Sequence, residues 1–237
     1  MEKLIYNEFQ LVGVDYIDAE KVDTYNSDMS FREVKHEHEL IFNHLKLSKN
    51  SSLLDIGAGT GLFAIEAAKI CQKVIAIDIS EVMLEQARKF AKSENLKNIS
   101  FIKGGFLSFD YKGPLLNHVT SFLALHHLPD FWKQIALLKI NKMLKLDGNF
   151  FLGDQVYSFK ADEYEKKLSE WVNINWERTH NSSFVNDVKM SITQEFSTFS
   201  WALEKMLAVA GFNFEIVDND SEFFSYYLCK KVKDVLI

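Results

Sequence analysis

Residues 53–61 read LLDIGAGTG, a short apolar run that passes directly into three closely spaced glycines. Such a run is typical of a buried strand that ends in a tight turn, and the spacing of apolar residues after it predicts a helix from about residue 60 to 70. Small residues in the turn allow backbone N–H groups to approach a ligand, and the N-terminal end of the helix favours negative charge. The stretch therefore predicts a strand, turn and helix that together bind a carboxylate or phosphate.

A second strand is predicted at residues 73–77, and it ends at Asp78. Asp78 comes nineteen residues after Gly59, and a carboxylate at the tip of the second strand can accept hydrogen bonds from both hydroxyls of a ribose. Ser80 then stands where a helix N-cap belongs. The loop and the acid together predict a site for an adenosine-containing cofactor.

The spacing of the glycines separates two classes of cofactor. Dinucleotide sites use G-x-G-x-x-G, in which the third glycine allows the helix to pack closely on the strand. Here that position is Leu62, and the third glycine comes one residue early, at Gly61. The pattern G-x-G-x-G, preceded by Asp55, resembles the cofactor signature of class I S-adenosylmethionine-dependent methyltransferases, which have a Rossmann-like fold.

The resemblance extends from about residue 50 to residue 157. VIAIDIS at 74–80, followed by MLEQA at 83–87, is similar to the family's second strand and helix. SFLALHHLPD at 121–130 is similar to its fourth strand and exit loop. The resemblance implies an enzyme that moves the methyl group of S-adenosylmethionine to an acceptor by in-line displacement and releases S-adenosylhomocysteine.

Short apolar runs alternate with stretches of helical period along the chain, which is typical of βαβ units. The predicted strands are residues 52–56, 73–77, 99–103, 119–123, 149–156, 213–217 and 223–230. We expect an α/β fold with a doubly wound, seven-stranded, mostly parallel sheet, a C-terminal antiparallel hairpin, helices on both faces and a helical insertion after the fifth strand. We expect one domain over residues 1–237, in which residues 1–48 form an N-terminal helical lid and residues 158–196 an insertion or cap.

The resemblance also implies which residues hold the cofactor. Those around its methionine portion would be Asp55, Gly57, Ala58, Gly59 and Gly61. Those around its ribose and adenine would be Asp78, Ile79, Met83, Gly105 and Phe106. Those beside the transferred methyl group would be Phe122, Leu123 and Ala124, with Tyr25 as a lid residue from the N-terminal segment.

One position departs from the family. The family usually has an Asp after glycine at the end of the third strand, where its side chain binds the adenine amino group, but this chain reads Gly104-Gly105-Phe106. Gly105 has no side chain to make that hydrogen bond. We expect backbone groups of Gly105 and Phe106 to contact the adenine and cofactor binding to be weaker or altered; an ordinary glycine turn is the alternative.

His126 and His127 are the candidate catalytic residues. If the acceptor is a protonated amine or a hydroxyl, an imidazole that titrates near neutral pH could remove its proton. The alternative is that the pair only shapes the loop after the fourth strand. No metal site is predicted, because His36 and His38 lie in a predicted polar helix and lack an evident third ligand.

Composition narrows the class of protein further. The 237 residues carry a net charge of −6, which disfavours nucleic acid as a substrate and leaves a small-molecule acceptor as the expected partner. No apolar stretch approaches the roughly 20 residues that span a bilayer, and the N-terminus is unlike a secretory signal, so we expect a cytoplasmic protein without membrane contact. Cys71 and Cys229 are expected to be reduced packing residues. The oligomeric state is left open.

Two other functions share these features. An NAD-dependent oxidoreductase has the same fold and ribose-binding acid, although Leu62 and the loop of His126 and His127 argue against it. A non-catalytic protein that binds S-adenosylmethionine is the second alternative, for which the departure at Gly105 leaves room.

Overall fold

The structure, a computed structural model, describes residues 4–10, 12–13 and 34–235. Its strands are β1 (Ser52–Ile56), β2 (Lys73–Asp78), β3 (Ile99–Lys103), β4 (Leu116–Phe122), β5 (Leu144–Tyr157), β6 (Thr198–Phe199), β7 (Phe212–Ser221) and β8 (Phe224–Lys231). Its α-helices are α2 (Val34–Leu45), α3 (Leu62–Ala68), α4 (Glu81–Ser93), α5 (Asp130–Met143), α6 (Tyr164–Thr179), α7 (Ser182–Gln194) and α8 (Ser200–Val209). Two one-turn 3₁₀ helices are η1 (Leu125–His127) and η2 (Ala161–Glu163).

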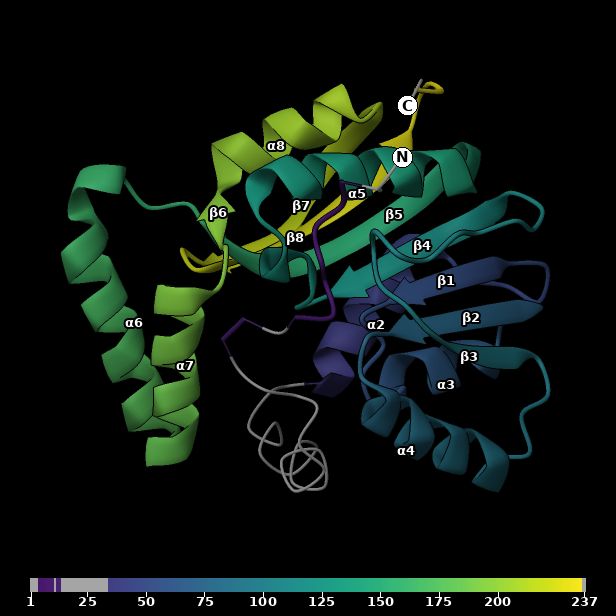
Figure 1. Cartoon of the computed structure of the whole chain (residues 1–237), viewed down its shortest axis with the longest axis horizontal. Helices are drawn as coiled ribbons and strands as arrows, with labels where there is room; N and C mark the ends of the chain where they lie inside the picture. The colour runs from purple at the N-terminus through teal and green to yellow at the C-terminus, as the bar shows by residue number, and fades with distance from the viewer. Residues whose placement is uncertain (1–3, 11, 14–33, 236–237) are drawn as a thin grey trace.

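One mixed sheet, in the order β3-β2-β1-β4-β5-β8-β7, organises these elements (Figure 1). Strands β1 to β5 run parallel to one another, whereas β8 is antiparallel to both of its neighbours, β5 and β7. The short β6 pairs with the end of β5 as an addition to the predicted strands. The predicted doubly wound sheet and C-terminal hairpin are therefore confirmed. Because the strand order reverses between β1 and β4, a ligand crevice is expected beyond the carboxyl ends of these two strands.

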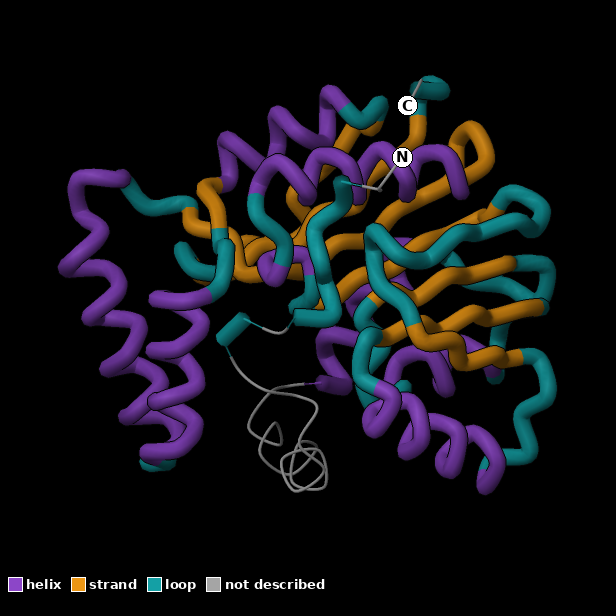
Figure 2. Tube along the Cα trace, viewed as in Figure 1, coloured by secondary structure: helices purple, strands orange, loops and turns teal. Residues whose placement is uncertain are grey.

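Alternate residues of the parallel strands face two layers of helices. Leu53 belongs to a hydrophobic cluster that includes Ala67 of α3, whereas Leu54 belongs to a separate cluster that includes Leu137 of α5 and Leu207 of α8. Figures 1 and 2 show α5 and α8 on one side of the sheet and α3 and α4 on the other. Because both faces are buried, the central strands read as continuous apolar runs rather than as alternating ones.

The insertion after β5 is a helical hairpin of α6 and α7 that extends away from the sheet (Figure 1). The sequence predicts a polar loop at residues 180–187, which is wrong because α7 already begins at Ser182. The Oδ1 atom of Asn181 accepts hydrogen bonds from the backbone N–H groups of Ser183 and Phe184, at 3.0 and 3.1 Å. Asn181 is therefore an N-cap, and its polar neighbours form the exposed first turn of a helix.

Two further details differ from the sequence prediction. Strand β5 begins at Leu144, directly after α5, and Asp147 lies inside it with a φ of 62° where the register with β4 shifts. The helical spacing of Met83, Ala87, Phe90 and Ala91 in the sequence predicts that all four lie on one buried face, but Phe90 is 41% exposed. The buried face of α4 is instead made by smaller side chains such as Ala87 and Ala91.

Among the described residues, no helix is both long and apolar enough to cross a membrane. Cys71 and Cys229 are free and buried, in agreement with their expected role in packing.

Candidate functional site

The glycine loop joins β1 to α3 at the carboxyl edge of the sheet. Gly57, Gly59 and Gly61 have φ values of 75°, 55° and 78°, a region that residues with a side chain rarely adopt. A Cβ atom at Gly57 would lie 2.4 Å from the Cβ atom of Ala124, and one at Gly61 would lie 2.8 Å from that of Ala87. At Gly59 a Cβ atom would meet nothing within 4 Å. The loop is therefore packed at both ends and borders open space at its centre.

Asp78, at the end of β2, is hydrogen bonded to this loop. Its Oδ2 atom accepts from Gly59 N at 2.8 Å, and its Oδ1 atom accepts from Ser80 N at 2.8 Å. Burial raises the pKa of the Asp78 carboxyl, although the backbone donors of Ser80, Gly59 and Ile79 oppose the shift. Ser80 caps α4 as predicted, because its Oγ atom accepts from Met83 N at 3.3 Å.

Asp55, in β1, is a buried carboxyl group beside the loop. Its Oδ1 atom accepts a hydrogen bond from Thr120 Oγ1 at 2.7 Å. Burial raises the pKa of Asp55 to about 7, with a smaller contribution from the negative charge of Asp78, whereas the hydrogen bond from Thr120 opposes the rise. A cation bound next to this group would favour its ionised form, so Asp55 suits an ammonium ligand.

The exit loop of β4 passes beside the glycine loop. Leu123 has a φ of 49°, which is uncommon for a residue of its size, and its N–H group donates to the carbonyl oxygen of Gly153 at 2.9 Å. A Cβ atom at Gly153 would lie 2.7 Å from the ring of Phe122, so the end of β4 packs closely on β5. This turn carries Ala124 to its contact with Gly57, and the structure thus brings together the two predicted loops.

Gly105, where the family has an acidic residue, lies against a carboxylate from elsewhere in the chain. A Cβ atom at Gly105 would lie 2.6 Å from the Oε2 atom of Glu8. The buried Glu8 side chain accepts from Leu107 N at 3.1 Å and from Ser108 N at 2.6 Å. The sequence predicts no role for Glu8, since nearly the whole N-terminal half of the fold separates it from Gly105. The sequence signal that points to this contact is Gly105, because the absence of a side chain there leaves the space that Glu8 occupies.

The remaining predicted cofactor residues lie nearby in different environments. Met83 and Phe106 are buried, and Phe106 belongs to the main hydrophobic core, whereas Ile79 is half-buried. Tyr25 lies outside the described residues.

The predicted histidines lie in η1, directly after Ala124, and meet two carboxylates that the sequence does not single out. His126 Nδ1 is 2.5 Å from Asp154 Oδ1, and His126 Nε2 is 3.3 Å from Glu195 Oε2. His127 Nδ1 is 3.8 Å from Glu195 Oε1. Asp154 is a charged residue in the apolar half of β5, and this position is a local sequence signal that could have identified it. Glu195 follows α7, and its sequence neighbours give no such signal.

The two imidazoles differ in their protonation. Burial alone would lower the pKa of His126, but the negative charges of Asp154 and Glu195 outweigh it and raise that pKa to about 9. Burial and the adjacent charge of His126 lower the pKa of His127 to about 4. One histidine of the pair is therefore positively charged at neutral pH and the other is neutral.

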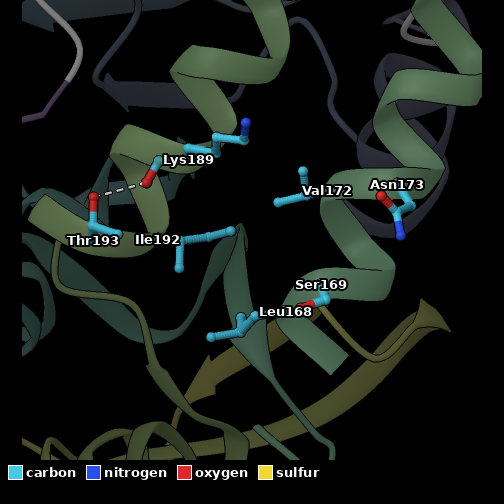
Figure 3. Close-up of a pocket in the computed structure, with 7 residues that line it drawn as sticks. All are labelled: Leu168, Ser169, Val172, Asn173, Lys189, Ile192 and Thr193. Atoms are coloured by element: carbon cyan, nitrogen blue, oxygen red, sulfur yellow. Dashed lines mark hydrogen bonds between the residues drawn. The ribbon is translucent and has the colours of Figure 1, made fainter. Parts of the chain in front are cut away.

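A separate cavity of about 340 Å³ lies between α6 and α7 (Figure 3). Its lining residues are Leu168, Ser169, Val172, Asn173, Lys189, Ile192 and Thr193. None of the predicted site residues that the structure describes lines this cavity, which belongs to the helical hairpin rather than to the crevice at the sheet edge.

Comparisons with known proteins agree with this arrangement. A family model described as a methyltransferase domain matches residues 47–205. An uncharacterized methyltransferase of Anoxybacillus flavithermus is 25% identical over 205 residues, which cover 86% of this chain and 90% of that protein. A crystal structure of a SAM dependent methyltransferase from Aquifex aeolicus aligns with a TM-score of 0.59 and 17% identity, over 91% of this chain and 99% of the other. The structure of a DhpI–SAH complex aligns with a TM-score of 0.61 and 14% identity, over 90% and 92% of the two chains.

Proposed function

The chain belongs to the methyltransferase domain family, and on that premise we propose that it moves the methyl group of S-adenosylmethionine to a small-molecule acceptor. The proposal depends on one arrangement, namely a glycine loop hydrogen bonded to Asp78 at Gly59, with the buried carboxyl of Asp55 beside it. Open space at Gly59, with the carboxyl groups of Asp55 and Asp78 on either side of the loop, fits a nucleoside that carries an amino-acid tail.

The cofactor would be held by groups of different chemistry along the sheet edge. Asp55 would pair with the ammonium group of the tail, and Asp78 would accept hydrogen bonds from the ribose hydroxyls. When bound, S-adenosylmethionine supplies a methyl group that its sulfonium has already activated. The chain's own part is to align the acceptor and exclude water, and alignment of this kind supplies up to roughly 7–11 kcal/mol in favourable cases.

Glu8 would complete the adenine end of this site. Because β3 lies beside β2, a nucleoside whose ribose contacts Asp78 extends its base toward the end of β3, where Gly105 and Glu8 meet. A carboxylate accepts hydrogen bonds from an exocyclic amino group. We therefore expect Glu8 to supply the acceptor that Gly105 cannot, together with the backbone of Gly105 and Phe106.

The acceptor would bind between the N-terminal segment and the insertion at residues 158–196. A Cβ atom at Gly13 would lie 2.3 Å from Glu195 Oε1, so these two parts of the chain meet beside the histidines. In this proposal the chain is one domain with an N-terminal lid and a helical cap, and His126 or His127 contacts the acceptor. The net charge of −6 favours a small molecule over a phosphate backbone as this acceptor.

Calorimetric titration tests the cofactor first. We expect S-adenosylhomocysteine to bind the purified chain with one site, and NAD not to bind. Tight NAD binding without binding of S-adenosylhomocysteine would contradict the proposal in favour of an oxidoreductase. Cell extract incubated with the chain and isotopically labelled S-adenosylmethionine should then give a labelled small molecule by mass spectrometry. Cofactor binding without transfer to any member of a broad acceptor panel would favour a non-catalytic binding protein.

A further inference from the structure

Four side chains from separate parts of the chain meet at the carboxyl ends of β4 and β5. They are His126 and His127 of η1, Asp154 of β5 and Glu195 after α7. A ring nitrogen of each histidine and a carboxylate oxygen of Glu195 all lie within 4.8 Å of one another. Phe196 N donates to the carbonyl oxygen of His126 at 2.9 Å, which holds the segment after α7 beside η1. Two imidazoles and one carboxylate thus form a compact set of nitrogen and oxygen ligands.

The spacing of these atoms matches that around a tetrahedral metal ion. Zn²⁺ binds histidine nitrogen and carboxylate oxygen at about 2.0–2.2 Å, so neighbouring ligand atoms lie about 3.3–3.5 Å apart. His126 Nε2 lies 3.3 Å from Glu195 Oε2, and His127 Nδ1 lies 3.8 Å from Glu195 Oε1. These two distances involve different oxygens of Glu195, and all three ligand atoms lie within 4.8 Å of one another, so the side chains would move closer together around a bound ion.

Asp154 holds His126 in the orientation that a ligand requires. Its carboxylate lies 2.5 Å from His126 Nδ1 and accepts from His126 N at 3.0 Å. Histidines that bind metals almost always donate their other ring N–H to a carboxylate, carbonyl or water. With Nδ1 directed at Asp154, the nitrogen that faces Glu195 is Nε2.

Charge and enclosure favour a cation at the same place. The side chains of Asp154 and Glu195 are only 4% and 2% exposed, and Gly13 packs directly on Glu195. Two buried carboxylates face one positively charged imidazole, so the cluster keeps a net negative charge, and buried charge is costly unless it is paired or coordinates a metal. The His127 side chain is 23% exposed, so the cluster retains one open side.

We propose that His126, His127 and Glu195 bind one divalent transition-metal ion, with Asp154 orienting His126. Imidazole and carboxylate together suit Zn²⁺ and its first-row neighbours rather than Mg²⁺ or Ca²⁺, which prefer oxygen ligands. Three protein ligands leave a fourth position for an external ligand. If the proposed function holds, that position takes a nitrogen or oxygen atom of the acceptor, because η1 directly follows the loop that contacts Gly57.

Spectroscopic titration of the full chain with Co²⁺ tests the site. The chain is first treated with a chelator and dialysed, and Co²⁺ is then added in steps. We expect one Co²⁺ per chain with the visible absorption bands of a four-coordinate ion, displacement by Zn²⁺, and no change on addition of Mg²⁺. Absence of Co²⁺ binding to the wild-type chain would overturn the proposal.

Variants identify the ligands. Glu195→Gln and His127→Ala should weaken Co²⁺ binding by about 100-fold or more, and Asp154→Asn by about 10- to 100-fold. The matched control is His180→Asn, at an exposed histidine that ends α6, and it should bind Co²⁺ as the wild type does. Wild-type affinity in both Glu195→Gln and His127→Ala would overturn the assignment of these ligands.

Binding of S-adenosylhomocysteine to the same metal-free samples keeps the two proposals apart. Variants that lose Co²⁺ but keep S-adenosylhomocysteine are folded, and their loss supports the metal site. A wild-type chain that binds S-adenosylhomocysteine but no Co²⁺ overturns the metal site alone. A chain that binds Co²⁺ but no S-adenosylhomocysteine supports the metal site and contradicts the proposed function.

Discussion

The two sides of the crevice are built from contacts of different range. On the cofactor side, Gly57 N and Ala58 N donate to the carbonyl oxygen of Ile77 at 2.9 and 3.0 Å, and Gly59 N donates to Asp78. All of these residues lie within two adjacent strands and the loop after the first. Backbone groups make most of these hydrogen bonds, so their geometry follows from the fold of a short segment.

On the acceptor side, side chains from distant segments make the contacts. His126, Asp154 and Glu195 come from three parts of the chain, and Gly13 packs on Glu195 from the N-terminal segment. These contacts require η1, β5 and the segment after α7 to be packed together. The comparison teaches that the glycine loop and Asp78 on the cofactor side are determined locally, whereas the acceptor side is determined by the tertiary fold.

The largest effect is expected at Gly57, where the two sides touch. Gly57→Ala should lower the free energy of unfolding by about 2–5 kcal/mol, because the new Cβ atom must tolerate a positive φ and would clash with Ala124. Urea denaturation measures the effect. Gly59→Ala is the matched control, since its Cβ atom has free space, and it should lower stability by only about 1–2 kcal/mol. Equal losses in the two variants would show that contact with Ala124 does not matter.

Asp78→Asn separates the two sides. A charged hydrogen bond contributes about 1.5–3 kcal/mol, so the variant should bind S-adenosylhomocysteine about 10- to 100-fold more weakly in calorimetry. Its affinity for Co²⁺ should stay the same, because Asp78 does not contact the histidine cluster. A parallel loss of Co²⁺ binding would indicate that the two sides are not independent.

Glu8 gives a third test, because it joins the cofactor side over a long range. Glu8→Ala leaves Leu107 N and Ser108 N without their acceptor, and we expect about 10- to 30-fold weaker binding of S-adenosylhomocysteine. Adding Gly105→Asp to this variant should restore part of the affinity, since the new carboxylate enters the vacated space. Gly105→Asp alone should not help, because its side chain would meet Glu8. Failure of the double variant to recover would argue against a carboxylate at this position.

The smallest effect is expected from pH. The pKa of Asp55 in the folded chain is about 7, above its ordinary value of 3.8, so the protonated form stabilises the free protein. That stability is present below about pH 4 and is lost as pH rises toward 7. Binding of an ammonium group requires the ionised form, so affinity for S-adenosylhomocysteine should increase from pH 6 to pH 8, by at most about tenfold. Asp55→Asn should flatten this dependence, and an unchanged slope would exclude Asp55 as its source.

The sequence predicts the local half of this molecule well. Asp78 and the cap at Ser80 follow from short-range patterns, because the groups that they contact lie within a few residues or in the next loop. The strands β1 and β2 follow from continuous apolar runs, since both of their faces are buried. These features depend on the order of neighbours along the chain and little else.

The other half depends on contacts that no local pattern encodes. Glu8 reaches Ser108 across about a hundred residues, and Glu195 reaches His126 because the segment after α7 lies beside η1, where Phe196 N donates to the carbonyl oxygen of His126. The start of α7 could have been predicted from the sequence, because Asn is a favoured N-cap residue. The polar residues that follow Asn181 are equally typical of a loop, however, so the sequence does not distinguish the two. A solvent-exposed helix and a loop have similar compositions, and only packing distinguishes them.

The contact between Gly13 and Glu195 has a consequence during biosynthesis. A ribosome adds about 5–20 residues per second. Residue 195 is therefore synthesised roughly 10–40 s after Gly13, and the contact between them cannot form before then. Leu107 and Ser108, which donate to Glu8, are synthesised after roughly half that interval. Nascent chains stalled between residues 108 and 195 should therefore already protect the amide of Ser108 from hydrogen exchange, although the contact between Gly13 and Glu195 cannot yet form.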